Sequence, residues 1–96
     1  MTTQSTNRVL LDHQIFKTLA HSQLVNNQYD FSRLLGRCPS YFSAVQAKRM
    51  PISVSSLVKL AAELQSRANS DRNPERVAVI QSVCNTLYSE IYARSV

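Results

Sequence analysis

The residues best suited to catalysis or metal binding in this 96-residue chain are two histidines, two cysteines and Asp12. His13 and His21 stand eight positions apart with no third or fourth ligand near them in sequence, so no metal site is expected. Asp12 beside His13 suggests no catalytic triad, and Cys38 has no obvious base. A single glycine cannot build a glycine-rich phosphate loop. We therefore expect no enzymatic activity, no metal and no small-molecule cofactor.

The distribution of positive charge is the strongest chemical signal in the chain. The formal net charge is +5, and residues 31–67 hold six basic residues and one acid, whereas the remaining residues hold five of each. The six basic residues are Arg33, Arg37, Lys48, Arg49, Lys59 and Arg67. Clustered cations gain free energy when they displace counterions from a phosphate backbone. The segment thus favours a polyanionic partner, although a solvated basic face is the simpler alternative.

Length and composition predict one domain that has no membrane contact. A chain of this length can bury a single core but leaves no room for a large enzymatic cleft. Apolar residues make up 44% of the sequence, and no apolar run approaches the roughly 18–20 residues that cross a bilayer. The polar N-terminus does not resemble a secretory signal. Cys38 and Cys84 suggest reduced thiols in a cytoplasm, with a single bridge between them as the alternative.

Helical periodicity runs along nearly the whole chain, and no strand-like alternation interrupts it. Caps and apolar stripes predict helices at residues 8–20, from Asn27 to Gly36, from Pro39 to Pro51, after Ser53 or Ser55, and from Asn73 onward. The predicted fold class is therefore an all-α, single five-helix domain. We divide it into a flexible N-terminus at residues 1–7, a helical domain at 8–72 with a central motif at 27–50, and a C-terminal helix at 73–96.

The only glycine, Gly36, marks the corner of the central motif. A short helix ends there, and after a brief connection the next helix has a narrow apolar edge made of Phe42 and Val45. Two helices that meet steeply across a short turn need a residue free to adopt positive φ, and glycine does so without steric cost. This is the helix-turn-helix arrangement, whose second helix leaves most of its surface unburied. Small side chains on that helix would let its backbone enter the major groove of DNA, which is about 12 Å wide.

The stretch "FSRLLGRCPSYFSAVQAKRMPISVSSLVKLAAEL" resembles the lambda-repressor-like (Cro/C1, xenobiotic-response-element type) helix-turn-helix DNA-binding family. The resemblance rests on Phe31-Ser32, Leu35-Gly36, the Pro39-Ser40 start, and a serine-initiated helix that ends Leu-Ala-x-x-Leu. The sequence departs from the family where Ser32 replaces the usual alanine, Arg37 a usual apolar residue, and Cys38 the usual Ser or Thr cap. Membership would imply double-stranded DNA as partner.

The resemblance also implies which residues approach DNA. They are the first residue of the second helix and the outer face and flank of the third, with the basic residues around it: Gln28, Arg37, Ser40, Tyr41, Ser43, Ala44, Gln46, Ala47, Lys48 and Arg49. Gln28 and Gln46 would read adenine, and Ala44 would meet a thymine methyl group. Arg37, Lys48 and Arg49 would contact phosphates. Tyr41 is equally suited to pack on its own domain.

The fifth helix carries an apolar seam at alternating spacings of three and four: Val77, Ile80, Cys84, Leu87 and Ile91. Such a seam is typical of helix pairing, and part of it must also cover the core of its own domain. In the family, C-terminal helices often pair, and a two-fold homodimer would match half-sites about one DNA turn apart. We therefore expect this seam to contribute to a homodimer.

Two functions follow from these observations. The first is a small, sequence-specific DNA-binding transcriptional regulator that is repressor-like and encoded by a prokaryote or mobile element and is expected in the bacterial cytoplasm or nucleoid. The second keeps the helix-turn-helix fold as a protein-interaction module, such as an anti-activator or antitoxin, without sequence-specific DNA binding. The confined positive charge favours the first, whereas the missing Arg or Asn on the outer face of the third helix favours the second.

Overall fold

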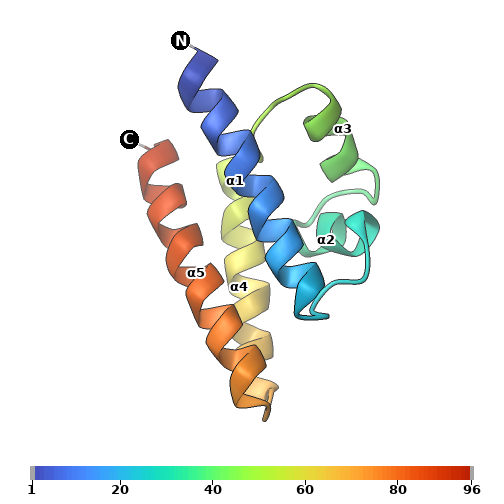
Figure 1. The fold of residues 1–96 in the computed structure, drawn as a ribbon, viewed down its shortest axis with the longest axis vertical. Coiled ribbons are helices and arrows are strands. Elements are labelled where there is room, and N and C mark those ends of the chain that lie inside the picture. Colours follow the sequence, from blue (N-terminus) through green and yellow to red (C-terminus); the bar gives the residue numbers. More distant parts are fainter. Residues whose placement is uncertain (1, 96) are drawn as a thin grey trace.

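The computed structural model describes residues 2–95, with side chains from residue 8 onward. These residues form five helices and no strand, so the all-α fold class predicted from the sequence is confirmed. The helices are α1 (Thr2–His21), α2 (Gln28–Leu34), α3 (Tyr41–Ala47), α4 (Val54–Ser70) and α5 (Pro74–Ser95). Figure 1 shows the three long helices side by side, with the two short helices α2 and α3 on one flank.

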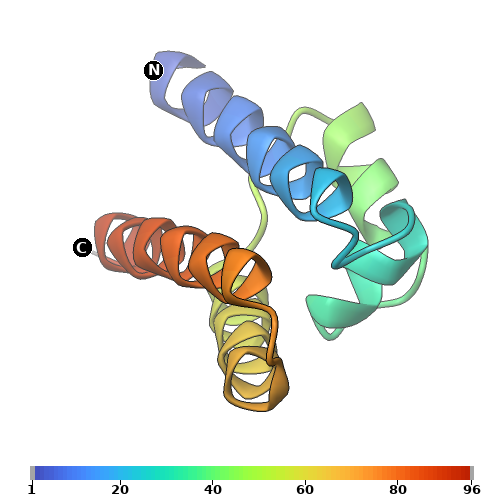
Figure 2. The same cartoon turned by 60° about the horizontal axis from the view of Figure 1, so that its bottom comes forward.

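The three long helices enclose the main core. α4 and α5 form the largest helix–helix contact, because each presents an apolar stripe to the other. Leu60 and Leu64 of α4 and Ile80 and Leu87 of α5 are fully buried between them. α1 packs against α5, beside which it runs in the second view of Figure 2, and it contributes the buried Leu19.

A group of three phenylalanine rings ties the short helices to this core. Phe16 of α1, Phe31 of α2 and Phe42 of α3 meet with ring centroids 4.7 to 5.4 Å apart. The Phe31 and Phe42 rings meet edge to face, a favoured geometry for aromatic pairs. Phe42 is the only fully buried side chain of α3. The third helix is therefore anchored at one point, as its narrow apolar edge predicts.

A residue with positive φ stands two positions after the end of each of the first three helices. These residues are Gln23 (φ 63°), Gly36 (φ 74°) and Arg49 (φ 53°). After each, an amide donates back to a carbonyl five residues earlier, as in the Schellman motif: Leu24 to Leu19, Arg37 to Ser32, and Met50 to Val45. At Gly36 a Cβ atom would also stand 3.0 Å from Cγ of Lys59. The role predicted for Gly36 at the corner is confirmed. The corners after α1 and α3 use Gln23 and Arg49, for which positive φ is sterically unfavourable.

Two predicted boundaries are wrong. α1 begins at Thr2, not at Arg8, so residues 2–7 continue the helix instead of forming a flexible N-terminus; they carry no apolar stripe that would have indicated it. The third helix begins at Tyr41 and not at Pro39. The Tyr41 amide donates to the Cys38 carbonyl at 3.0 Å, which closes a turn over Pro39 and Ser40. Proline supports that turn as well as it would a helix start.

Candidate nucleic-acid interface

The outer face of α3 is exposed and made of small side chains. Ser43, Ala44 and Ala47 are all exposed along it, and Ser40 is exposed just before it. All four side chains are short, so they would not keep a binding partner away from the helix backbone. The backbone of α3 is therefore open to close approach by a partner from outside.

Ser32 of α2 sets where α3 begins. Its side chain is fully buried, its hydroxyl donates to the Gln28 carbonyl at 2.9 Å, and it accepts from the Phe42 amide at 3.0 Å. The Phe42 amide is one of the first amides of α3, which have no partner inside the helix. Ser40, at the N-cap position, makes no side-chain capping bond. Ser32 thus caps α3 from the neighbouring helix, a role that the sequence did not predict.

Arg37, predicted as a phosphate contact, bridges the turn and the start of α4. Its Nε donates to Ser56 Oγ at 2.8 Å, and its Nη2 donates to Ser55 Oγ at 3.1 Å and to Ser53 Oγ at 3.2 Å. The guanidinium also lies 5.4 Å from the centre of the Tyr41 ring. Ser53 occupies the N-cap position of α4 without making a capping bond. Arg37 is exposed but held in place, and nothing local in the sequence indicates these serine partners.

Tyr41 packs on its own domain, the second of the two roles weighed for it. The residue is half-buried, and its hydroxyl accepts from the Ser53 amide at 3.2 Å. Burial alone would raise the pKa of Tyr41, but the bonds with Ser53 and Ser56 and the charge of Arg37 outweigh it and lower that pKa. The tyrosine hydroxyl is therefore part of the contact between α3 and the α3–α4 connection.

The predicted glutamines are less accessible than the serines and alanines. Gln28, the first residue of α2, and Gln46 of α3 are both half-buried. The Gln46 side-chain nitrogen is shielded from solvent without a hydrogen-bond partner among the described residues. An orphaned buried amide group is unusual. Gln46 would have to turn its amide outward before it could contact a base.

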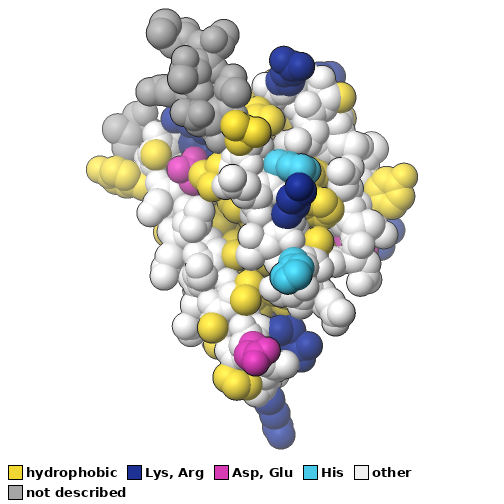
Figure 3. Space-filling view, in the orientation of Figure 1, with side chains coloured by type: hydrophobic (Ala, Val, Ile, Leu, Met, Phe, Trp, Pro, Cys, Tyr) yellow, Lys and Arg dark blue, Asp and Glu magenta, His cyan; other side chains and the backbone are white. Residues whose placement is uncertain are grey.

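The rim of α3 is positively charged. Lys48 and Arg49 follow the helix and are exposed, and the Lys59 side chain, 54% exposed, lies over Gly36. The sequence has no acid between Phe31 and Ala62. Lys and Arg side chains project near the segment after α3 at the upper edge of Figure 3. Three basic side chains thus lie around α3, of which Lys59 also lies 3.3 Å from the Glu63 carboxylate of α4.

The apolar seam of α5 is mostly occupied by its own domain. Ile80, Cys84 and Leu87 are between 0% and 1% exposed, and Val77 and Ile91 are half-buried. The thiol of Cys84 lies 4.0 Å from the Ala61 carbonyl of α4, and burial raises its pKa. The prediction that these five residues form a dimer seam is wrong for the buried three. Their spacing marked a core-facing stripe, and α4 already covers it.

Cys38 and Cys84 are both free thiols, so the alternative of a bridge between them is not realised. The described residues contain no group of three His, Cys, Asp or Glu side chains placed to hold a metal ion. The two histidine side chains are separate on the face shown in Figure 3.

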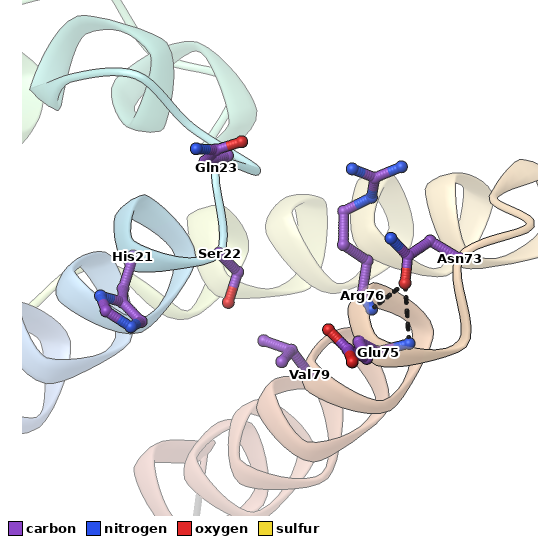
Figure 4. A pocket seen from close by; sticks show the side chains of 7 residues that line it. All are labelled: His21, Ser22, Gln23, Asn73, Glu75, Arg76 and Val79. Atoms are coloured by element: carbon purple, nitrogen blue, oxygen red, sulfur yellow. Dashed lines mark hydrogen bonds between the residues drawn. The ribbon is translucent and has the colours of Figure 1, made fainter.

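A hollow lies at the other end of the molecule, between the end of α1 and the start of α5. It has a volume of about 340 Å³ and includes His21, Gln23, Glu75 and Arg76 in its lining (Figure 4). Its polar groups largely serve the fold, since Asn73 Oδ1 accepts from the amides of Glu75 and Arg76 and so caps α5.

No helix within residues 2–95 is both long enough and apolar enough to span a bilayer. Searches of curated proteins and of solved structures return no significant match. A match to a family model does exist and covers most of the chain. Residues 12–95 match the family of unknown function DUF6626, and the chain belongs to this family.

Proposed function

We propose that this protein is a small DNA-binding transcriptional regulator of the helix-turn-helix type that inserts α3 into the major groove. One observation carries the proposal: α3 has an exposed face of small side chains, and its rim is basic with no acid nearby in sequence. A helix with such a face can approach base edges closely, while surrounding cations hold the phosphates. The resemblance to lambda-repressor-like domains, which spans about 40 residues, supports the same conclusion.

In this proposal the residues divide into two groups. Ser43, Ala44 and Ala47 face the base edges, and Lys48 and Arg49 contact phosphates and set the register. Arg37 is held beside the N-terminal end of α4, so its fixed positive charge lies close to the positive end of the α4 dipole. A phosphate contact there would need no reordering of the arginine side chain. Tyr41 is not among the proposed contacts, because its hydroxyl is engaged.

The proposal keeps a homodimer as the DNA-binding form but assigns it to other residues than the buried seam. Tyr88 and Tyr92 of α5 are 49% and 73% exposed and lie one turn apart on the same helix. Tyrosine is enriched in interfaces because it combines a large apolar ring with a polar end. A monomer mass that does not change with concentration, measured by sedimentation of the unchanged protein, would remove the homodimer from the proposal. A dimer that Tyr92→Ser leaves intact would remove Tyr92 from its interface.

DNA binding is tested with a matched pair of alanine substitutions. Ala44→Glu places a carboxylate on the exposed face of α3, and Ala78→Glu places one on the exposed face of α5. We expect Ala44→Glu to abolish binding to duplex DNA from upstream of the coding sequence, as measured by fluorescence anisotropy. Ala78→Glu should bind like the unchanged protein. Equal binding by both variants would show that α3 is not the docking helix.

The phosphate contacts are tested by the dependence of binding on salt. Removing two such contacts lowers the slope of log K against log salt concentration by about two. We expect this for Lys48→Ala combined with Arg49→Ala, with weaker binding to every sequence. Lys17→Ala combined with Arg72→Ala removes two exposed charges outside the basic segment and should leave the slope unchanged.

A second function remains a candidate because of α5. Its exposed Tyr88 and Tyr92, together with the exposed Val58 of α4, are large apolar side chains outside the α3 face. They favour a protein-interaction module, such as an anti-activator or antitoxin. Binding to DNA at moderate salt by the unchanged protein, lost in Ala44→Glu, would decide against that alternative. In either case the proposed setting is the cytoplasm, and no catalytic step is involved.

A further inference from the structure

The segment that follows α3 is held by a buried ion pair from both ends of the chain. Asp12 of α1 is fully buried, the Arg94 side chain near the end of α5 is 4% exposed, and Arg94 Nη2 donates to Asp12 Oδ1 at 2.8 Å. Between them lies Ile52, in the connection between α3 and α4. Its amide donates to Asp12 Oδ2 at 2.8 Å, and its carbonyl accepts from Arg94 Nη1 at 3.1 Å.

The Arg94 guanidinium also contacts a second carboxylate, that of Glu90. Arg94 Nε donates to Glu90 Oε1 at 3.1 Å, and Nη2 lies 3.0 Å from the same oxygen. Burial raises the pKa of Asp12, and the bonds from Arg94 and from the Ile52 amide limit that rise. An ion pair in such a place adds little net stability compared with apolar packing, because desolvation offsets the attraction. Its main effect is on geometry, because it fixes both the amide and the carbonyl group of Ile52.

That residue is close to the basic rim of α3. Ile52 follows Arg49, which has positive φ, by three positions, and its own side chain is 2% exposed. α3 has only one fully buried side chain, so apolar packing alone holds its far end weakly. The position of Lys48 and Arg49 therefore depends on how the connection is held at Ile52.

We infer that Arg94 and Asp12 are positioning residues for the α3 face: by holding both backbone groups of Ile52, they fix the α3–α4 connection and the placement of Lys48 and Arg49. The last turn of α5 thereby controls a segment 42 residues away in sequence. A molecule that draws this turn away from α1 would release the connection. The effect on DNA contacts rests on the proposed function, whereas the effect on the connection does not.

The experiment measures the connection first, without DNA. Native-state hydrogen exchange is followed by NMR at the Ile52 amide and, as a reporter of the core, at the Leu64 amide of α4. Arg94→Met keeps a long apolar side chain, but it leaves the Ile52 carbonyl without its donor and Asp12 without its cationic partner, so only the bond from the Ile52 amide to Asp12 remains. We expect the ratio of the Ile52 rate to the Leu64 rate to rise by about tenfold, because the Ile52 carbonyl loses a hydrogen bond from a charged group that contributes about 1.5 kcal/mol. An unchanged ratio would overturn the inference.

Two further variants separate the effect of Arg94 on Ile52 from a general loosening of α5. Arg94→Lys retains the charge beside Asp12 but cannot form the fork that reaches Asp12 and the Ile52 carbonyl together, so it should fold and show a smaller rise. Glu90→Gln removes a carboxylate that does not touch Ile52 and should leave the ratio unchanged. A rise in Glu90→Gln as large as in Arg94→Met would show that Ile52 merely follows the loosening of α5, against the inference.

DNA binding is then compared between Arg94→Lys and the unchanged protein, at a temperature where both are folded. If the unchanged protein binds DNA and Arg94→Lys binds less tightly with a smaller salt slope, the positioning role is supported. If exchange at Ile52 is faster but DNA binding is unchanged, the positioning role is refuted. If the unchanged protein binds no duplex, the proposed function fails, and the exchange ratio still decides whether the ion pair holds the connection.

Discussion

Replacing Arg49 by glycine should make the protein more stable and a weaker DNA binder. Arg49 ends α3 with φ 53°, in the left-handed region that side chains other than glycine adopt at a cost of about 1–2 kcal/mol. Glycine removes that cost but adds about 0.4–1 kcal/mol of unfolded-state entropy. The balance is a gain of about 0.5–1 kcal/mol, which corresponds to a rise of about 2–8 °C in melting temperature for a domain of this size.

The same substitution removes one proposed phosphate contact. The salt slope of DNA binding should fall by about one. Affinity at low salt should fall about tenfold, since one charge-assisted hydrogen bond contributes about 1.5 kcal/mol. Gln23→Gly is the matched control, because Gln23 ends α1 with φ 63° and the same backward hydrogen bond. We expect it to stabilise the protein equally and to leave DNA binding unchanged.

Calorimetry and anisotropy on the two variants separate the two parts of this reasoning. A lower melting temperature for Arg49→Gly would refute the assignment of backbone strain at the end of α3. A higher melting temperature with unchanged DNA affinity would keep the strain but refute the phosphate contact. If Gln23→Gly weakened DNA binding as much as Arg49→Gly, the loss could not be assigned to the arginine side chain.

Two other substitutions test how α2 and α3 are joined. Ser32→Ala leaves the Phe42 amide buried without an acceptor and should lower the free energy of unfolding, measured by urea denaturation, by about 1–2 kcal/mol; this is the lower part of the range for such a loss, because alanine favours helix. The control, Ser82→Ala at an exposed site, should change the free energy of unfolding by less than about 0.5 kcal/mol. Equal effects of the two substitutions would refute the capping role of Ser32. Gly36→Ala should cost about 1–2 kcal/mol through its positive φ. Adding Lys59→Ala should restore only the part due to the 3.0 Å contact, and complete restoration would contradict the backbone explanation.

The elements that the sequence predicted well are those with a long apolar stripe or a defined corner. Residues 54–70 show the spacing of a core-facing helix, and α4 forms there. Gly36 was predicted to turn the corner between α2 and α3 and does so with φ 74°. Both predictions depend on residues close in sequence. The start of α1 was missed because residues 2–7 have no apolar stripe, and periodicity cannot mark a helix that lacks one.

The contacts that set the candidate interface were not predictable in the same way. Ser32 was seen only as a departure from a family pattern, and its bond to the Phe42 amide depends on the angle between two helices. Asp12 and Arg94 are 82 residues apart, and no local pattern relates them. The α5 seam shows the limit most clearly: its spacing correctly indicates a buried stripe, but spacing does not say which surface covers it.

The way α3 is held explains how its outer face can be free. A helix of seven residues is far too short to be stable alone in water, and α3 compensates with only one fully buried side chain. Directional bonds supply the remainder: Ser32 to the Phe42 amide at one end, the Tyr41 hydroxyl to the Ser53 amide, and the ion pair on Ile52 beyond the other end.

All of these bonds lie on the inner side of α3 or beyond its ends, so its outer residues are not needed to keep it in place. Substitutions at Ser43, Ala44 or Ala47 should therefore change stability by less than about 0.5 kcal/mol, as expected for exposed positions. If α3 reads DNA as proposed, substitutions on its outer face can change the recognised sequence while the orientation of the helix is preserved. A large loss of stability on replacing Ala44 by glutamine, a good helix former, would show instead that the outer face helps to hold the fold.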